Sequence, residues 1–106
     1  MRTQVFVESS GNVFADLKLP KADDLLVKAD LTARILQEFE RRRLTQGQAA
    51  ALLGVDQPKI SALKQGKLTA FSIERLMRFL VRLGRDIEIK VKDRPRSRPL
   101  ARLRVA

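Results

Sequence analysis

The sequence predicts a mainly α-helical domain of four to five helices, followed by one short β-strand. Three observations carry this prediction. Apolar residues recur at helical spacing through most of residues 23–83, and Gly, Ser and Asp residues stand where helices begin and end. Residues 86–92 instead alternate between apolar and charged side chains. At 106 residues the chain is long enough for one modest core, and its five aromatic residues are all Phe, so we expect that core to be aliphatic.

We expect three segments along the chain. Residues 1–19 form an N-terminal extension, in which residues 2–8 alternate weakly and can form a short strand. Residues 20–92 form the helical domain. It starts with a long helix over about 23–43, either one helix or two joined near residues 29–30, whose start is indicated by Pro20 and the acidic residues that follow it. Residues 93–106 form a basic tail.

The stretch from Thr45 to Gly66 predicts two short helices separated by residues 54–56. Thr45 is a suitable N-cap for the first helix, with Gln48 three residues on as its capping-box partner. Asp56 is a suitable N-cap for the second. This spacing is typical of a helix-turn-helix, which places its second helix in the major groove of DNA. The domain is therefore expected to be a compact, lambda-repressor-like helix-turn-helix bundle.

A further helix is predicted over residues 73–83, capped by Ser72, and a strand over Asp86–Lys92. A lone strand needs a partner strand. The candidates are Val5–Val7 of the same chain and the same segment of a second copy, and we favour the second copy. This makes the three apolar residues of the segment a dimerisation strand: Ile87, Ile89 and Val91. After Asp93 the chain holds five Arg and no acid, which predicts a disordered basic arm.

Charge indicates a polyanionic partner. The formal net charge is +10, of which residues 45–106 contribute +9 through fourteen basic and five acidic residues. No apolar run is long enough to span a membrane and the first ten residues lack a signal-peptide core, so we expect a cytoplasmic protein with no membrane partner. The absence of Cys and His, of metal-ligand spacing and of a Gly-rich phosphate loop argues against an enzyme, a metal site or a cofactor.

The candidate DNA-contacting residues lie on the second predicted helix and around its ends. A helix placed with Ile60 and Leu63 inward presents small and polar residues on its other sides, where a Gln can pair with adenine and an Ala can touch a thymine methyl. The expected base-reading residues are Gln57, Pro58, Lys59, Ser61 and Ala62. The expected phosphate-contacting residues are Thr45, Gln46, Lys64 and Lys67.

The same residues resemble the Xre/Cro–C1 helix-turn-helix family. The flanking stretches GNVFADLKLPKADDLLVKADL and FSIERLMRFLVRLGRDIEIKVK extend the similarity over roughly residues 10–92, to the HigA-like antitoxins of type II toxin–antitoxin pairs. The resemblance implies a homodimer that binds a palindromic operator in its own promoter and neutralises a RelE/HigB-like ribonuclease toxin. It assigns base reading to Gln57, Pro58, Ser61 and Ala62, and a phosphate contact to Gln46. Pro58 departs from the polar residue often found there.

Two alternatives remain open from the sequence. One is a stand-alone Xre-type regulator without a toxin. The other is a less specific nucleic-acid-binding module driven by the basic tail.

Overall fold

The computed structural model describes residues 21–98 and 102–106. The predicted N-terminal extension, with its candidate strand over residues 2–8, therefore lies outside the described residues. The described part is mainly helical, as predicted. It contains α2 (Lys21–Arg41), α3 (Gln46–Leu53), α4 (Gln57–Lys64), the short 3₁₀ helix η1 (Leu68–Ala70) and α5 (Ile73–Arg82). The long helix α2 is continuous through residues 29–30, which settles the choice between one helix and two.

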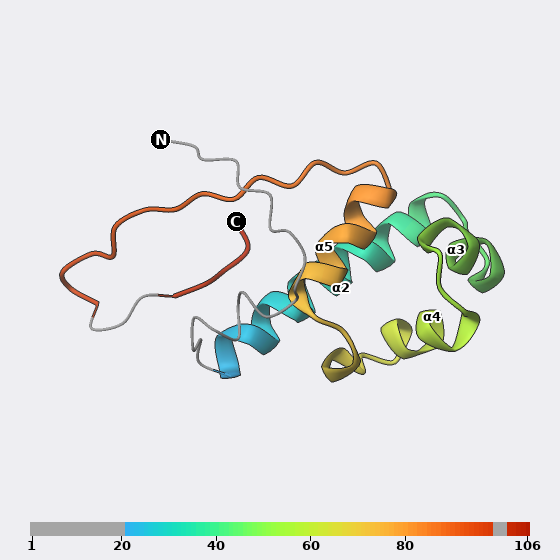
Figure 1. Cartoon of the computed structure of the whole chain (residues 1–106), viewed down its shortest axis with the longest axis horizontal. Coiled ribbons are helices and arrows are strands. Elements are labelled where there is room, and N and C mark those ends of the chain that lie inside the picture. The colour runs from blue at the N-terminus through green and yellow to red at the C-terminus, as the bar shows by residue number, and fades with distance from the viewer. Residues whose placement is uncertain (1–20, 99–101) are drawn as a thin grey trace.

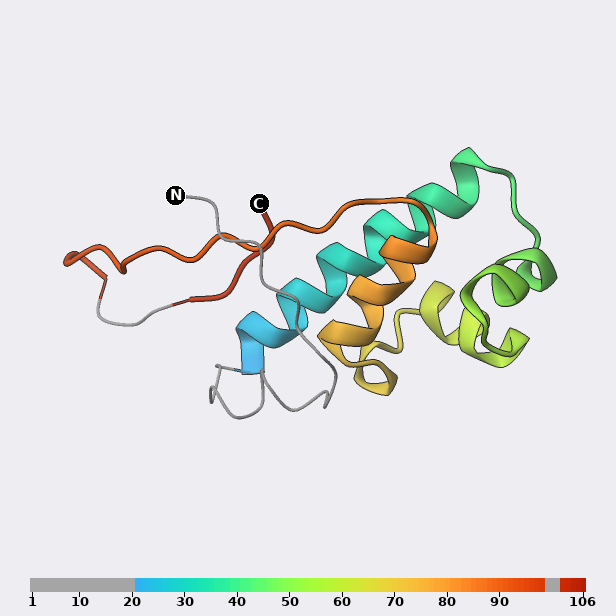
Figure 2. The ribbon, with the colours of Figure 1, turned by 45° about the horizontal axis from the view of Figure 1, so that its top comes forward.

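The core forms where α5 lies alongside α2 and where α3 and α4 pack at the C-terminal end of this pair (Figures 1 and 2). Helix α2 contributes a stripe with a spacing of four residues, and α5 contributes an inner face at helical spacing. Burial of each such side chain stabilises the fold by about 1.5–3 kcal/mol. The buried apolar residues are Val27, Leu31, Ile35, Phe39, Ala49, Ala50, Leu53, Ile60, Leu63, Phe71, Ile73, Leu76, Phe79, Leu80 and Leu83.

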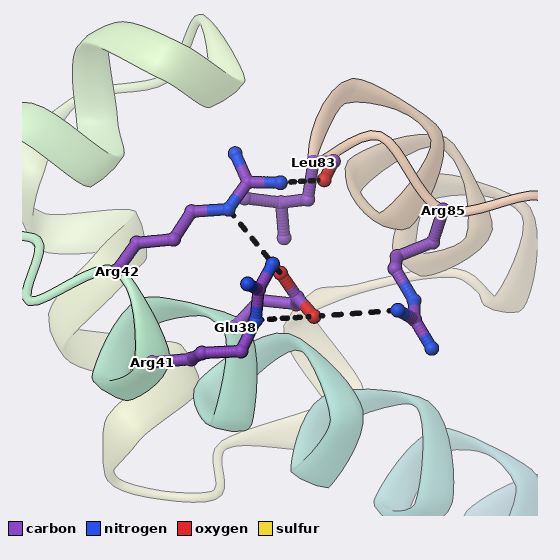
Figure 3. Close-up of polar contacts among 5 residues, drawn as sticks. All are labelled: Glu38, Arg41, Arg42, Leu83 and Arg85. Carbon is purple, nitrogen blue, oxygen red and sulfur yellow. Dashed lines mark hydrogen bonds and ion pairs between the residues drawn. The ribbon is translucent and has the colours of Figure 1, made fainter.

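A cluster of charges ties the end of α5 to the end of α2 (Figure 3). The carboxylate of Glu38, which is 6% exposed, accepts a hydrogen bond of 2.7 Å from Nη2 of Arg41 and one of 3.2 Å from Nε of Arg42. Arg85 approaches the same carboxylate at 3.7 Å, and Arg42 also donates to the carbonyl of Leu83. The hydrogen bond from Arg41 lowers the pKa of Glu38, and the nearby cations lower it further. The cluster thus joins the end of α5 and the first residue of the C-terminal segment to α2.

The predicted C-terminal strand is not formed. Residues 85–97 carry neither helix nor strand, and no β-ladder occurs anywhere in the described residues. The alternation is visible only in burial: Ile87 and Ile89 are half-buried, whereas Val91 is 67% exposed. A strand is defined by its hydrogen-bonded partner, and the described residues of one chain supply none. The prediction of a strand within the chain is therefore corrected to an extended segment.

Among the described residues, no helix is long and apolar enough to cross a membrane, and no group of His, Cys, Asp or Glu is arranged to hold a metal ion.

Candidate nucleic-acid interface

The N-terminus of α3 is capped as the sequence predicted. The backbone N–H of Gln48 donates to Oγ1 of Thr45 at 3.1 Å, and the N–H of Thr45 donates to Oε1 of Gln48 at 2.9 Å. This reciprocal pair leaves other N–H groups of the first turn facing solvent, at the positive end of the helix dipole. Thr45 and Gln46 are both exposed there. The two residues therefore stand where an anion such as a DNA phosphate can approach.

The turn between α3 and α4 is built around Gly54, which has a left-handed φ of 70°. A side chain at this position is disfavoured by the backbone, and a Cβ atom would also lie 3.2 Å from Nη1 of Arg82 on α5. Asp56 then caps α4, since its Oδ1 accepts a hydrogen bond of 3.3 Å from the N–H of Lys59. The turn thus sets the angle between the two helices, and its glycine lies beside Arg82 of α5.

Helix α4 has the two faces expected of a recognition helix. Ile60 and Leu63 are 0% exposed, so they anchor the helix in the core. Gln57 and Pro58 are exposed at its N-terminal end, while Ser61 and Ala62 are half-buried along the adjoining side. The candidate base-reading side is therefore open to solvent at the end that would enter the groove first.

Gln57 lies against the start of α3, a contact that the sequence did not reveal. A Cβ atom built on Gly47 would lie 3.4 Å from Nε2 of Gln57, so the amide rests over the glycine. From the sequence, Gly47 only weakens α3, by up to about 1 kcal/mol relative to Ala. In the structure it brings the Gln57 amide beside the first turn of α3. The candidate base-reading residue and the candidate phosphate-contacting residue Gln46 therefore belong to one surface.

Lys59 reaches the ring of Phe71, which lies between η1 and α5. Its Nζ lies 5.9 Å from the centre of the Phe71 ring, and Cζ of Arg75 lies 5.7 Å from the same ring. Arg75 also lies 5.6 Å from the ring of Phe79. Cations over aromatic faces are held by the ring quadrupole. The sequence had grouped Lys59 with the base-reading residues and did not identify Arg75; the structure pairs the two on one flank of α4.

The opposite flank of α4 carries Lys64. This side chain lines an open hollow together with Arg43 and residues from the C-terminal end of α2. Arg43 adopts a left-handed backbone conformation, with a φ of 54°, just before α3. Lys67 is exposed in the loop after α4. Basic side chains therefore surround α4 on both flanks and at its C-terminal end.

The three residues of the predicted dimerisation strand are not part of this surface. Ile87 and Ile89 follow α5, and Ile87 packs against the core. Val91 is exposed further along the extended segment.

Comparison with known proteins agrees with this geometry. A family of helix-turn-helix domains matches residues 13–92. A solved structure named as an XRE family transcriptional regulator is 45% identical, with a TM-score of 0.76, and the alignment covers 82% of this chain and 98% of that one. No curated protein matches. The family match stops at residue 92, so the Arg-rich tail lies outside it.

Proposed function

The chain belongs to the Xre-type helix-turn-helix family, and on that basis we propose that it is a sequence-specific DNA-binding transcriptional regulator. The observation that carries the proposal is the two-faced helix α4. Its apolar residues Ile60 and Leu63 are fully buried, while Gln57 and Pro58 are exposed beside the N-terminus of α3. A helix held in this way can lie in the major groove of DNA.

In this proposal Gln57 pairs with an adenine, because its amide can donate to N7 and accept from N6 at once. Pro58 offers apolar contact only, and Ala62 can touch a thymine methyl. Thr45 and Gln46, with the free N–H groups of α3, bind a phosphate and set the register. Lys64 and Lys67 contact phosphates beside the groove. Lys59 joins them, since its position over Phe71 directs it to the flank.

Gln57→Ala tests the assignment of base reading. We expect it to weaken operator binding by about 1–3 kcal/mol and to relax the preference at one base pair. The matched control is Gln37→Ala, which removes an exposed amide from α2. Anisotropy titrations with a set of single-base operator variants measure both effects. Unchanged affinity of Gln57→Ala for the operator would mean that α4 is not the recognition helix.

Lys67→Ala tests the assignment of phosphate contact. Loss of one cation should weaken binding to operator and scrambled DNA alike and lower the slope of log affinity against log salt by about one. A titration over salt concentration with both duplexes measures this. If parent protein bound the two duplexes equally at every salt concentration, the regulator proposal would fail in favour of a less specific nucleic-acid-binding module.

We further propose that the regulator is a homodimer in which Asp86–Lys92 pairs with the same segment of a second copy. Support comes from the extended alternating segment, which has no ladder partner in the described residues, and from the exposure of Val91. Two copies of α4 would then read a palindromic operator at sites about 34 Å apart. Analytical ultracentrifugation tests this: Val91→Asp should shift the equilibrium to monomer, and Lys90→Gln, on the opposite face, should not. A parent protein that is monomeric at all concentrations contradicts the proposal.

The finer proposal is that the chain is an antitoxin that represses its own promoter. It rests on the similarity of the stretches that flank the helix-turn-helix to HigA-like antitoxins. The test is co-expression with the product of the adjacent gene: a RelE/HigB-like ribonuclease that co-purifies with this chain and is inhibited by it supports the proposal. An adjacent gene of another kind would leave a stand-alone regulator.

A further inference from the structure

The Arg-rich tail gathers its positive charge in one place. The chain turns at residues 95–98, where the N–H of Arg98 donates to the carbonyl of Pro95 at 3.0 Å. The side chain of Arg94 reaches across this turn to the carbonyl of Arg98. Partial burial lowers the pKa of Arg98, and the positive charges of Arg102, Arg104 and Arg94 lower it further. The side chain of Arg94 and the backbone of Arg98 thus meet at the turn, and the positive charges of Arg102 and Arg104, from beyond the turn, act on Arg98.

The end of the tail is held against the body of the protein. Leu103 and Val105 are half-buried against the core, whereas Arg102 and Arg104, which alternate with them, are exposed. Nη2 of Arg34, on α2, donates to the backbone carbonyl of Ala106 at 2.9 Å. The apolar side of this short segment thus faces the protein and the basic side faces solvent.

The position of the tail separates it from the helix-turn-helix. In Figure 1 the turn lies at one end of the molecule and α3 and α4 lie at the other, along a longest dimension of 47 Å. One turn of B-DNA spans about 34 Å. The turn of the tail therefore lies away from the base pairs that α4 of its own chain would contact.

We propose that Arg94, Arg98, Arg102 and Arg104 form a second phosphate-binding surface, which engages the backbone of duplex DNA outside the base pairs that α4 contacts. The inference rests on the proposed function. Gathered like charges repel one another, and a polyanion relieves that repulsion. Guanidinium groups match phosphate oxygens through paired hydrogen bonds, which favours nucleic acid over other anions. The phosphates belong either to the flanks of the same duplex or to a second duplex.

The main test compares parent protein with the variant in which these four Arg are changed to Gln. Each protein is titrated, over a range of salt concentrations, with a duplex of operator length and with the same operator extended by about 20 base pairs on each side. Each phosphate contact adds about 0.9 to the slope of log affinity against log salt. With flanking contacts, we expect the parent slope on the long duplex to exceed that of the variant by up to about four per chain. The two proteins should have equal slopes on the short duplex.

A capture assay distinguishes the second source of phosphate. The short operator is immobilised, protein is bound, and a labelled unrelated duplex is added. Retention of that duplex by the parent, and not by the four-Arg variant, supports contact with a second duplex. Equal slopes on the long duplex together with no retention would overturn the proposal. Binding of polyglutamate to the parent but not to the variant, with equal DNA slopes, would overturn it in favour of an acidic protein partner.

Two further variants test whether DNA binding depends on the arrangement of the four Arg or only on the net positive charge of the C-terminal segment. Lys90→Gln removes an exposed cation that precedes the turn and is not one of the four Arg, so it should lower the long-duplex slope less than Arg102→Gln does. The double change Leu103→Ser and Val105→Ser keeps every charge but releases the anchor. The double variant should keep the slope and weaken affinity several-fold. An effect of Lys90→Gln equal to that of Arg102→Gln, with no loss of affinity in the double variant, would contradict the cluster. Operator preference on the short duplex tests the proposed function separately.

Discussion

The helix-turn-helix and the C-terminal segment of this chain complete their structures in opposite ways. In residues 45–66 the backbone needs of each helix start are met three residues away, by Thr45 and Asp56. In residues 85–106 the backbone has no ladder within the described residues, and the segment is held by half-buried side chains such as Ile87 and Val105. The contrast teaches that alternation alone does not make a strand, because a strand needs a partner for its backbone hydrogen bonds. A capped helix satisfies those of its own backbone within a few residues.

The first test of this difference is to truncate one buried or half-buried apolar side chain in each region. Ile60→Ala should lower the free energy of unfolding by about 2–5 kcal/mol, because it empties a fully buried site in α4. Ile89→Ala, at a half-buried position, should cost a small fraction of that. Urea unfolding at a protein concentration low enough to suppress self-association measures both. Equal losses would mean that the C-terminal segment is as much a part of the core as α4.

A second pair of substitutions tests whether the two regions differ in their need for a helix N-cap. Asp56→Ala removes the N-cap of α4 and should cost about 0.5–2 kcal/mol of stability. Asp86→Ala is the matched control, because that exposed carboxylate starts the extended segment, where there is no helix to cap. Thermal unfolding of the parent and the two variants measures the loss of stability in each. A loss at Asp86 as large as that at Asp56 would show that residue 86 has a structural role of its own.

The sequence was sufficient wherever the deciding interaction is local. The caps at Thr45, Asp56 and Ser72 were all predicted and all form. The inward direction of Ile60 and Leu63 followed from helical spacing and is confirmed by their complete burial. Each of these features depends on residues at most four positions apart, so the pattern itself contains the information.

The features that the sequence did not reveal depend on contacts between distant segments. The amide of Gln57 meets Gly47 across the turn, Lys59 shares Phe71 with Arg75, and Arg42 reaches the carbonyl at the end of α5. The spacing of residues in the sequence does not predict such contacts, because they depend on how the helices pack. The predicted strand was wrong for a related reason: the residues alternate as predicted, but a strand needs a partner strand, and the described residues contain none.

The last and smallest effect concerns Glu38 of α2, whose carboxylate Arg85 approaches from the start of the C-terminal segment. Its pKa is lowered in the folded protein by Arg41 first and also by Arg42 and Arg85. A carboxylate with a lowered pKa stabilises the fold fully above its ordinary pKa of 4.5, and this contribution is lost as the pH falls through the lower folded value. The effect should be modest, since Arg41 and Arg85 are 64% and 61% exposed and water screens them.

Glu38→Gln should therefore be less stable than the parent at pH 7, and the gap should close as the pH drops below 4.5. Unfolding curves from pH 7 to pH 3 measure it, with Glu40→Gln as the control on the exposed side of the same helix. Parallel pH profiles of parent and Glu38→Gln would contradict the assignment.

Because Arg85 is the first residue of the C-terminal segment, loss of this cluster should also loosen the start of that segment while leaving the capped helices α3 and α4 intact. In Glu38→Gln, amide hydrogen exchange should therefore become faster only in residues after Leu83, which would show that the C-terminal segment opens independently of α3 and α4.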